Sequence, residues 1–239
     1  VPTGKTFLGT IADHDVDRLS TVIQPTASAA MSREKVAAAV LLTQPFPPVI
    51  YYGDEIGMRG AKASTGSDAD DIPFREPFKW NAVAGSPMSN YFVLNSNRYT
   101  NRVERDNDGR SVQEQSGVAA SLLETYRTLI AARRNNIALR RGSYSPATSS
   151  DGRVWAFVRS HDDQTLLVAI NLSGSSFSTT LNLSGFTVIS GTTTPTDVLT
   201  GGTLAPITTA NRAAYSMPMS PYSWRILSVA LTPPAPPPP

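Results

Sequence analysis

The chain has 239 residues, 40% hydrophobic and 17% charged, which is enough apolar material for one large domain or two ordinary ones and too few charges for a disordered protein. The 21 basic and 19 acidic residues leave a net charge of +2, and no run of Lys or Arg could follow a phosphate backbone, so nucleic-acid binding is not supported. The absence of cysteine excludes disulfides, and no apolar run reaches the ~20 residues that span a bilayer.

The first predicted element is a short, mostly apolar strand over residues 6–12. It follows an N-terminus without Met and without the apolar core of ~7–15 residues that a signal peptide has, so we expect the chain to be the interior of a longer protein. The strand runs into IADHDVDR, residues 11–18, which holds three aspartates and a histidine. Aspartate is common in solvated turns, so this cluster has a structural interpretation beside a functional one.

A helix and a second strand are predicted next. Residues 32–44 are rich in alanine, with apolar residues at helical spacing, and the prolines at 45, 47 and 48 should end the helix. Residues 49–52 are apolar throughout and stop at Gly53, as in a parallel strand buried on both faces. Strand, helix and strand with short joints predict a βαβ unit of a parallel sheet.

Residues 57–111 form a long polar stretch, and loops of this length are usually functional or disordered. The helix that follows has a capping box of Ser121 and Glu124. Its predicted apolar face consists of Leu122, Tyr126, Leu129 and Ile130. The basic pair Arg133–Arg134 suits the C-terminus of this helix.

After Gly142 the pattern changes to short strand-like runs separated by Ser, Gly, Thr and Asn, at residues 154–158, 166–170, 177–183 and 223–231. Such runs predict an antiparallel β-sandwich. We therefore expect a first domain over residues 1–142, a sandwich over 143–231 and a proline-rich tail or linker over 232–239.

Three motifs in this order resemble the end of the catalytic barrel of the α-amylase family of glycoside hydrolases: His14-Asp15 followed by Arg18, the segment 48–58 (PVIYYGDEIGM) and the segment 71–80 (DIPFREPFKW). The similarity continues through 121–133 and 138–144, the usual passage into that family's C-terminal sandwich. The resemblance implies an incomplete (β/α)8 barrel, formed by its last two strands and their helices, followed by an antiparallel β-sandwich.

The resemblance also implies roles for four residues. Asp15 would stabilise the cationic transition state and hold sugar hydroxyls, and His14 would hydrogen-bond the sugar beside the scissile bond. Asp71 and Arg75 match a family pair that binds sugars toward the non-reducing end. A salt bridge that merely anchors the loop is the other interpretation of that pair.

Other motif residues are predicted to be structural. The family usually has Asn where this chain has Asp13, whose contact with substrate stays open. Arg18 resembles a structural arginine, and four large side chains are interpreted as core or packing residues: Tyr51, Tyr52, Met58 and Trp80. The acidic run 68–71 is interpreted as a solvated loop rather than a calcium site. We predict no metal or cofactor site in this chain, and calcium in the complete enzyme stays open.

A retaining glycosidase needs a nucleophilic carboxylate and a general acid, which the family supplies from motifs on earlier barrel strands. Those motifs are missing here, and the six glutamates lie in helices, after the last barrel strand or in later loops. We therefore expect a C-terminal fragment that is inactive by itself. Its incomplete barrel should pair with the missing N-terminal part or with a swapped copy, because its apolar inner face would otherwise be exposed to water.

The predicted function is that of an α-amylase-type retaining hydrolase acting on α-1,4-glucans such as starch and maltodextrins. A non-catalytic carbohydrate-binding or interaction module, and a related α-glucosidase or transglycosylase, stay open as alternatives. The resemblance and the proline-rich tail predict a secreted protein, with neither nucleic acid nor a membrane as partner.

Overall fold

The computed structural model describes residues 5–23, 27–64, 66, 68–89 and 103–234. Contacts divide the chain into two compact units. We call Phe7–Leu41 with Pro48–Arg127 the helical unit, and Val1–Thr6 with Leu42–Pro47 and Thr128–Pro239 the β unit. Among the described residues, no helix has the length and apolar character needed to cross a membrane.

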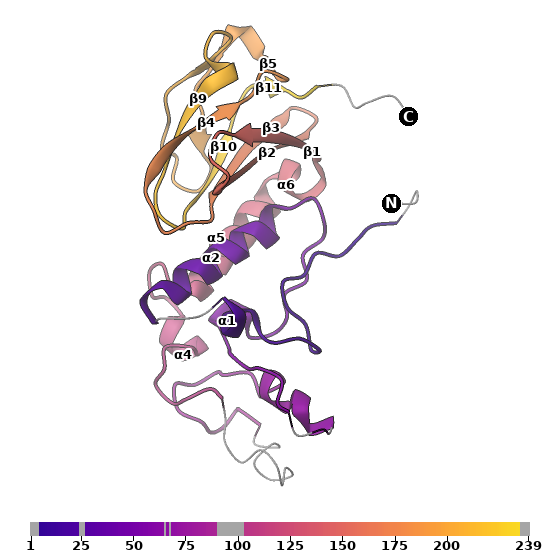
Figure 1. The fold of residues 1–239 in the computed structure, drawn as a ribbon, viewed down its shortest axis with the longest axis vertical. Helices are drawn as coiled ribbons and strands as arrows, with labels where there is room; N and C mark the ends of the chain where they lie inside the picture. The colour runs from indigo at the N-terminus through magenta and orange to yellow at the C-terminus, as the bar shows by residue number, and fades with distance from the viewer. Residues whose placement is uncertain (1–4, 24–26, 65, 67, 90–102, 235–239) are drawn as a thin grey trace. The chain divides into compact units, whose positions relative to one another are not determined.

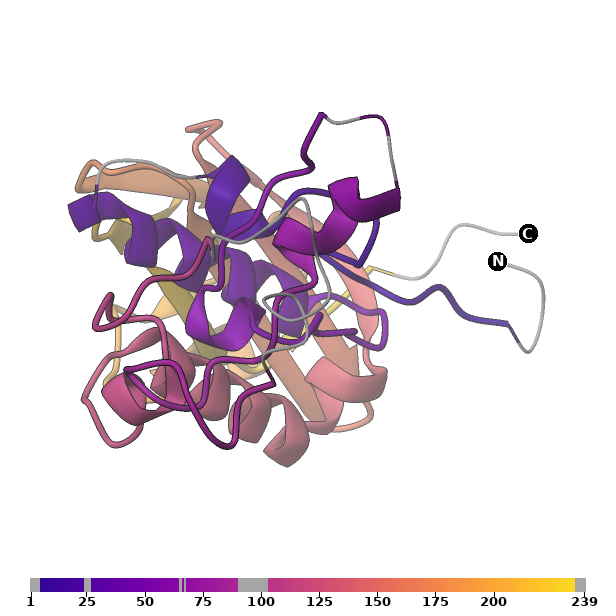
Figure 2. The ribbon, with the colours of Figure 1, turned by 90° about the horizontal axis from the view of Figure 1, so that it is seen from below.

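The helical unit combines two longer helices with several short helical turns, joined by long loops (Figures 1 and 2). Its elements are α1 (Leu19–Val22), most of α2 (Ala27–Thr43), the 3₁₀ turns η1 (Asp54–Ile56) and η2 (Asp68–Phe74), α4 (Val112–Gln115) and the start of α5 (Leu122–Asn135). Helix α2 begins at Ala27 rather than at Ser32, because the alanines before Ser32 are good helix formers. It ends before Pro45, as predicted.

The two predicted strands of this unit meet in parallel, but only at one point. Gly9 and Pro48 form an isolated parallel bridge, in which the amide of Val49 donates to the carbonyl of Gly9 over 2.7 Å. The prediction of regular strands over 6–12 and 49–52 was therefore wrong, although their parallel direction was right. A parallel strand needs neighbours on its sides and cover on its faces. The apolar side chains of these segments stay exposed instead: Phe7, Leu8 and Val49.

Helix α5 begins where the capping pattern predicts. The hydroxyl oxygen of Ser121 accepts the amide of Glu124 over 3.2 Å, but Glu124 turns its carboxylate to Gly117 and Arg127 instead of returning the bond. The predicted apolar face is buried at Leu122, Tyr126 and Leu129. Ile130 is 42% exposed, so its assignment to that face was wrong. Eight residues after Leu122, it is rotated by about 80° at the helical period.

Arg133, in the last turn of α5, caps the C-terminal end of α2. Its guanidinium donates to the carbonyls of Leu42, Gln44 and Phe46 over 2.8–2.9 Å. Leu42 lies in the last turn of α2, whose carbonyls have no partner inside the helix. The guanidinium at the end of α5 therefore supplies hydrogen-bond donors to a carbonyl in the last turn of α2 and to two carbonyls just after it.

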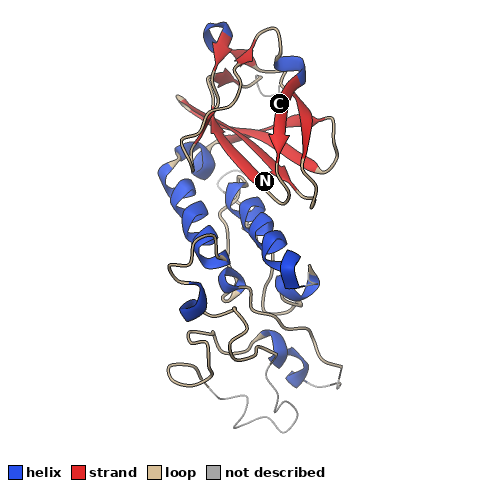
Figure 3. Ribbon diagram, turned by 90° about the vertical axis from the view of Figure 1, so that its left-hand side faces the viewer, coloured by secondary structure: helices blue, strands red, loops and turns tan. Residues whose placement is uncertain are grey.

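The β unit contains α6 (Ile137–Arg141) and a set of antiparallel strands (Figure 3). The strands are β1 (Ser143–Ser149), β2 (Val154–His161), β3 (Gln164–Asn171), β4 (Phe177–Asn182), β5 (Thr187–Val188), β6 (Thr192–Thr193), β7 (Thr196–Asp197), β8 (Ile207–Thr208), β9 (Tyr215–Met219), β10 (Trp224–Ser228) and β11 (Leu231–Thr232), with 3₁₀ turns η3 (Ile189–Gly191) and η4 (Arg212–Ala214). Seven strands form one sheet in the order β7-β10-β3-β2-β1-β4-β9.

Strand β1 joins the two halves of that sheet. Residues 143–147 pair with β2, whereas Thr148 and Ser149 pair with β4. One hydrophobic core receives side chains from both halves, among them Leu167 of β3 and Met217 of β9. The halves therefore pack face to face, as in the antiparallel architecture that the strand pattern predicts.

Candidate functional site

The site begins in the turn that follows the Gly9 bridge. The carboxylate of Asp13 accepts the amide of Asp15 over 2.8 Å, an Asx turn that shapes the loop. The imidazole Nε2 of His14 lies 3.3 Å from the carboxylate of Asp15, and these two side chains are 67% and 65% exposed. Asp13 thus supports the loop, while His14 and Asp15 are presented to solvent.

Arg75 connects this turn to the loop after η2. Its Nε donates to the carbonyl of His14 over 2.8 Å, and one terminal nitrogen lies 3.0 Å from Asp15 and 2.6 Å from Asp71. The four predicted site residues are thereby brought together, although 60 positions separate Asp15 from Arg75. Arg75 is the centre of the cluster, and the carboxylates of Asp15 and Asp71 share one of its terminal nitrogens.

Two further residues belong to the cluster and were missed by the sequence interpretation. The ammonium group of Lys62 lies 3.0 Å from the second carboxylate oxygen of Asp71, and the amide of Lys62 donates to Asp17 over 2.7 Å. Lys62 lies in the part of the long polar stretch that precedes the 71–80 motif, where no periodicity or motif singles out one residue. Only its proximity to Asp71 in the fold places Lys62 in the cluster.

The segment of residues 49–52 supports the loop that carries Arg75. The hydroxyl of Tyr51 donates to the carbonyl of Phe74 over 3.1 Å, and that of Tyr52 donates to the carbonyl of Glu76 over 2.9 Å. Burial raises the pKa of Tyr52 to about 12, so its hydroxyl stays a donor. The interpretation as core side chains was wrong for Tyr52, whose ring is 37% exposed.

Arg18 is structural, as its place in the motif suggests. It is fully buried, lies over the rings of Tyr51 and Tyr52 at 4.6 and 4.8 Å, and donates to the carbonyl of Tyr52 over 2.7 Å. Cation–π contacts of a desolvated guanidinium are among the stronger ones. Arg18 therefore anchors the two tyrosines.

Met58 and Trp80, the other two residues predicted to pack, differ in their exposure. Met58 is fully buried, whereas Trp80 is 49% exposed and packs edge-on against Phe78, with ring centres 4.7 Å apart. The prediction of a packing role is therefore confirmed for Met58, and for Trp80 it was only partly right.

The acidic run 68–71 does not form a solvated loop. Asp70 is buried and accepts the amide of Gly66 over 2.9 Å, and Asp71 is held by Arg75 and Lys62. These carboxylates are engaged with protein donors.

Asp13, His14 and Asp15 offer ligand atoms within 4.8 Å of one another. The guanidinium of Arg75 already lies against Asp15, and its positive charge disfavours a metal ion there. The geometry fits neutral hydroxyl groups, which accept from arginine and lysine and donate to aspartate.

The family model described as the catalytic domain of α-amylase matches residues 3–142, and the model described as the C-terminal domain of maltogenic amylase matches residues 147–226. Alpha-amylase 3 of Dictyoglomus thermophilum is 26% identical over 163 residues, which cover 68% of this chain and 29% of that protein. Trehalose synthase/amylase TreS of Mycobacterium tuberculosis is 34% identical over 142 residues, covering 56% and 22% respectively.

Among solved structures, a mutant of the trehalulose synthase MutB in complex with Tris superposes with a TM-score of 0.66 at 23% identity, covering 93% of this chain and 43% of that one. The predicted fold class, a partial barrel followed by an antiparallel β domain, is thereby confirmed. The chain spans less than a third of the length of the curated relatives described above. Since the catalytic-domain model alone matches more than half of its residues, the chain belongs to the α-amylase family.

Proposed function

We propose that this chain is part of a retaining glycoside hydrolase that acts on α-1,4-glucans such as starch and maltodextrins. The observation that carries the proposal is the convergence of Asp15 and Asp71 on the guanidinium of Arg75, in a chain of the α-amylase family. A relative named as an α-amylase supports this substrate class.

Asp15 is proposed to stabilise the transition state. Its carboxylate accepts hydrogen bonds from sugar hydroxyls, and these bonds strengthen as positive charge develops on the sugar ring. Arg75 holds the carboxylate through an ion pair at 3.0 Å, and His14, whose imidazole is exposed, is proposed to bond the same sugar. Interactions that tighten in the transition state increase kcat.

Asp71, Arg75 and Lys62 are proposed to bind sugars toward the non-reducing end. They present one acceptor and two cationic donors close together. Vicinal hydroxyls of glucose offer the complementary pattern, because each hydroxyl both donates and accepts. The contribution of this group should therefore depend on the length of the glucan chain.

The nucleophile and the general acid are proposed to come from barrel segments outside these residues. Every glutamate of the chain is engaged in a structural contact. Four of them accept backbone amides: Glu55, Glu76, Glu104 and Glu114. Glu34 pairs with Arg110 at 3.0 Å, and Glu124 pairs with Arg127 at 2.6 Å.

A second candidate function is transglycosylation, in which a sugar hydroxyl replaces water as the acceptor. It is favoured by the match to trehalose synthase/amylase TreS. The chemistry up to the glycosyl intermediate is shared, so Asp15 would keep its role.

Product analysis of the complete enzyme distinguishes these functions; by complete enzyme we mean this chain together with the barrel segments that precede it in its relatives. Hydrolysis of maltoheptaose to shorter maltooligosaccharides, with little reaction on maltose, is expected. Conversion of maltose to an isomeric disaccharide without net hydrolysis would establish the transglycosylase instead. Inactivity toward both, in an enzyme shown to be folded, would contradict the proposal.

A further inference from the structure

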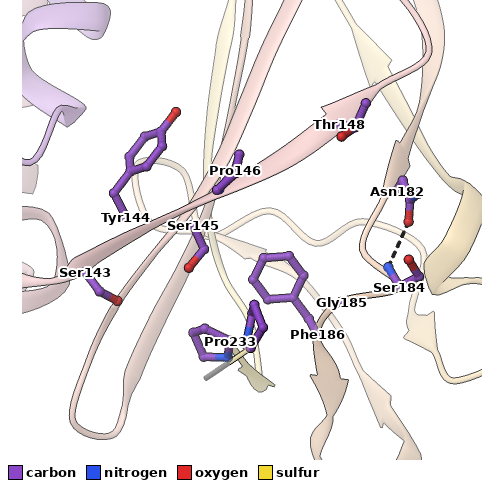
Figure 4. Close-up of a pocket in the computed structure, with 11 residues that line it drawn as sticks. Ser143, Tyr144, Ser145, Pro146, Thr148, Asn182, Ser184, Gly185, Phe186 and Pro233 are labelled. Atoms are coloured by element: carbon purple, nitrogen blue, oxygen red, sulfur yellow. Dashed lines mark hydrogen bonds between the residues drawn. The ribbon is translucent and has the colours of Figure 1, made fainter. Parts of the chain in front are cut away.

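Two groups of polar side chains lie outside the Asp15 cluster, one in each unit. In the β unit, a pocket of about 510 Å³ lies beside β1, and the residues that line it carry no charge (Figure 4). In the helical unit, five charged side chains form a second cluster, which we call the buried charge cluster: Arg59, Glu76, Lys79, Glu104 and Asp108. Of the two groups, only the buried charge cluster can change its charge near neutral pH.

The buried charge cluster joins two segments that are distant in the sequence. The carboxylate of Glu76 accepts the amides of residues 103 and 104 over 2.5 and 3.3 Å. The ammonium group of Lys79 is fully buried and contacts the carboxylate of Asp108. Since Glu76 directly follows Arg75, these contacts support the segment that carries the centre of the proposed sugar site.

The buried charge cluster has three carboxyl groups but only two cations. Other charged side chains nearby do not correct the imbalance. Arg110, whose amide donates to Asp108 over 3.1 Å, pairs its guanidinium with Glu34. Arg105 and Asp106 are exposed. A buried negative charge without a partner is costly, so one carboxyl group of the cluster is expected to keep its proton.

Glu104 is the carboxyl group that suits the proton. Its Oε1 accepts the amide of Arg59, whose Nε lies 3.6 Å away, but no donor among the described residues reaches its Oε2. Burial, assisted by the nearby Asp108, raises the pKa of Glu104 to about 7. Although burial opposes the change, the hydrogen bond from Lys79 lowers the pKa of Asp108. A protonated Glu104 can donate to Asp108, whereas two ionised carboxylates would repel each other.

We propose that Glu104 and Asp108 form a pH-sensitive latch for the segment that carries Arg75. With one proton between them, the two carboxyl groups attract each other, and residues 75–80 stay against residues 103–108. When that proton leaves, a buried charge without a cation remains, and separation of the two segments lets water reach it. Arg75 then loses the support that keeps it in contact with Asp15 and Asp71. The latch follows from contacts within the helical unit, and only its consequence for sugar binding rests on the proposed function.

Hydrogen exchange of the complete enzyme tests the latch. It is measured by mass spectrometry without substrate between about pH 5 and 9, and is corrected for the intrinsic rate of exchange. Opening returns Glu104 to the ordinary pKa of a glutamate, about 4.5. Protection of the amides of residues 75–80 and 103–108 should therefore fall about tenfold per pH unit between about pH 5 and 7, and level off above pH 7.

Glu104→Gln carries a neutral amide that keeps the hydrogen bonds of the protonated acid at every pH. In this variant the protection of both segments should not change with pH. Glu114→Gln is the control, since Glu114 also accepts a backbone amide, that of Gly109 over 2.8 Å, and its variant should follow the native profile.

Constant protection in the native enzyme would overturn the latch, whether or not the variants fold. A fall that persists in Glu104→Gln would also overturn it, and its loss in Asp54→Asn would assign the effect to Asp54. Because the exchange is measured without substrate, these results do not depend on the proposed function, which the product analysis tests separately.

Discussion

At Arg75, a single guanidinium contacts a backbone carbonyl and two carboxylates from distant parts of the chain. An arginine side chain has five N–H donors in a fixed plane, which lets it hold several oxygens in one geometry. The side chain of the exposed Asp15 is therefore held in one orientation, and in its proposed role positioning of this kind would reduce the barrier of the chemical step. The residue predicted to bind sugar is thus also a positioning residue for Asp15.

Asp15→Asn in the complete enzyme keeps the size of the side chain and removes its charge. We expect kcat on maltoheptaose to fall by about two orders of magnitude or more, roughly 3 kcal/mol, because the cationic transition state loses its anion. The Tm of thermal unfolding should change little, since the side chain of Asp15 is 65% exposed. A kcat close to that of the native enzyme would mean that Asp15 is only a turn residue.

Arg75→Ala should reduce kcat/KM on maltotriose and on maltoheptaose, with the larger loss on the longer substrate. The fall in kcat/KM that both substrates share measures how much the contact with Asp15 contributes. The additional fall on maltoheptaose measures the contacts with sugars distant from the scissile bond. Loss of a charge-assisted hydrogen bond suggests about 1.5–3 kcal/mol for each part. Steady-state kinetics on both substrates, with Arg75→Lys as the variant that keeps the charge, provides the measurement. Native kinetics on maltotriose would show that the contact with Asp15 is dispensable.

Among the elements, helix ends show most clearly how local and distant contacts combine. The start of α5 is stabilised locally by Ser121. The end of α2 is stabilised by Arg133, about 90 positions further along the chain. A cap within one turn is visible in the sequence, whereas a cap supplied by another helix is not.

Ser121→Ala tests the local cap. The hydroxyl also donates to the carbonyl of Gln115 over 2.8 Å, so its removal takes the acceptor from the amide of Glu124 and one of two donors from that carbonyl, which keeps the amide of Val118. We expect the free energy of unfolding to fall by about 1 kcal/mol, the usual cost of losing an N-cap. Urea denaturation measures the change, with Ser116→Ala at an exposed position as the control. Equal stability of the two variants would show that the cap does not contribute.

On the scale of the molecule, the helical unit buries more charge than a typical core. Burial raises the pKa of Asp54 to about 7, assisted by the nearby Glu55 and Glu34 and opposed by Arg18. Burial also raises the pKa of Glu104 to about 7. Neither oxygen of Asp54 accepts a hydrogen bond from the described residues, so its ionised form is poorly stabilised.

These pKa values predict a pH dependence of stability. Between pH ~4, where an unfolded aspartate loses its proton, and pH 7, the folded state binds more protons than the unfolded state. The contribution of protonated Asp54 to the free energy of unfolding is fully present below pH ~4 and is lost as the pH rises through 7. The difference in unfolding free energy between Asp54→Asn and the native chain should therefore shift in favour of the variant between pH 4 and 7. A difference that does not vary with pH would show that Asp54 has an ordinary pKa.

The isolated 239-residue chain should not hydrolyse starch, because its glutamates are engaged in structural contacts and the family's nucleophile and acid motifs are missing. A reducing-sugar assay on the purified chain measures this. Turnover at rates typical of enzymes that survives repeated purification would show that a carboxylate of this chain acts as nucleophile.

The sequence by itself determined the class of the fold and the start of α5, and its motifs singled out the four candidate site residues. These features depend on local signals: hydrophobic periodicity, a capping pair, prolines at a helix end and residue types at fixed spacing. Such signals act within one or two turns of chain, so a single sequence displays them.

Only the tertiary structure decided what those residues contact. The structure shows one parallel bridge, between Gly9 and Pro48, where two regular strands were expected, because a strand needs neighbouring strands on its sides. It placed Lys62 beside Asp71, Arg75 between two carboxylates and Arg133 at the end of α2. Long polar side chains can contact residues that are far away in the sequence. The positions of two such residues in the sequence therefore do not predict whether their side chains meet in the fold. That is why the motifs predicted the members of the site, while its connections came from the fold.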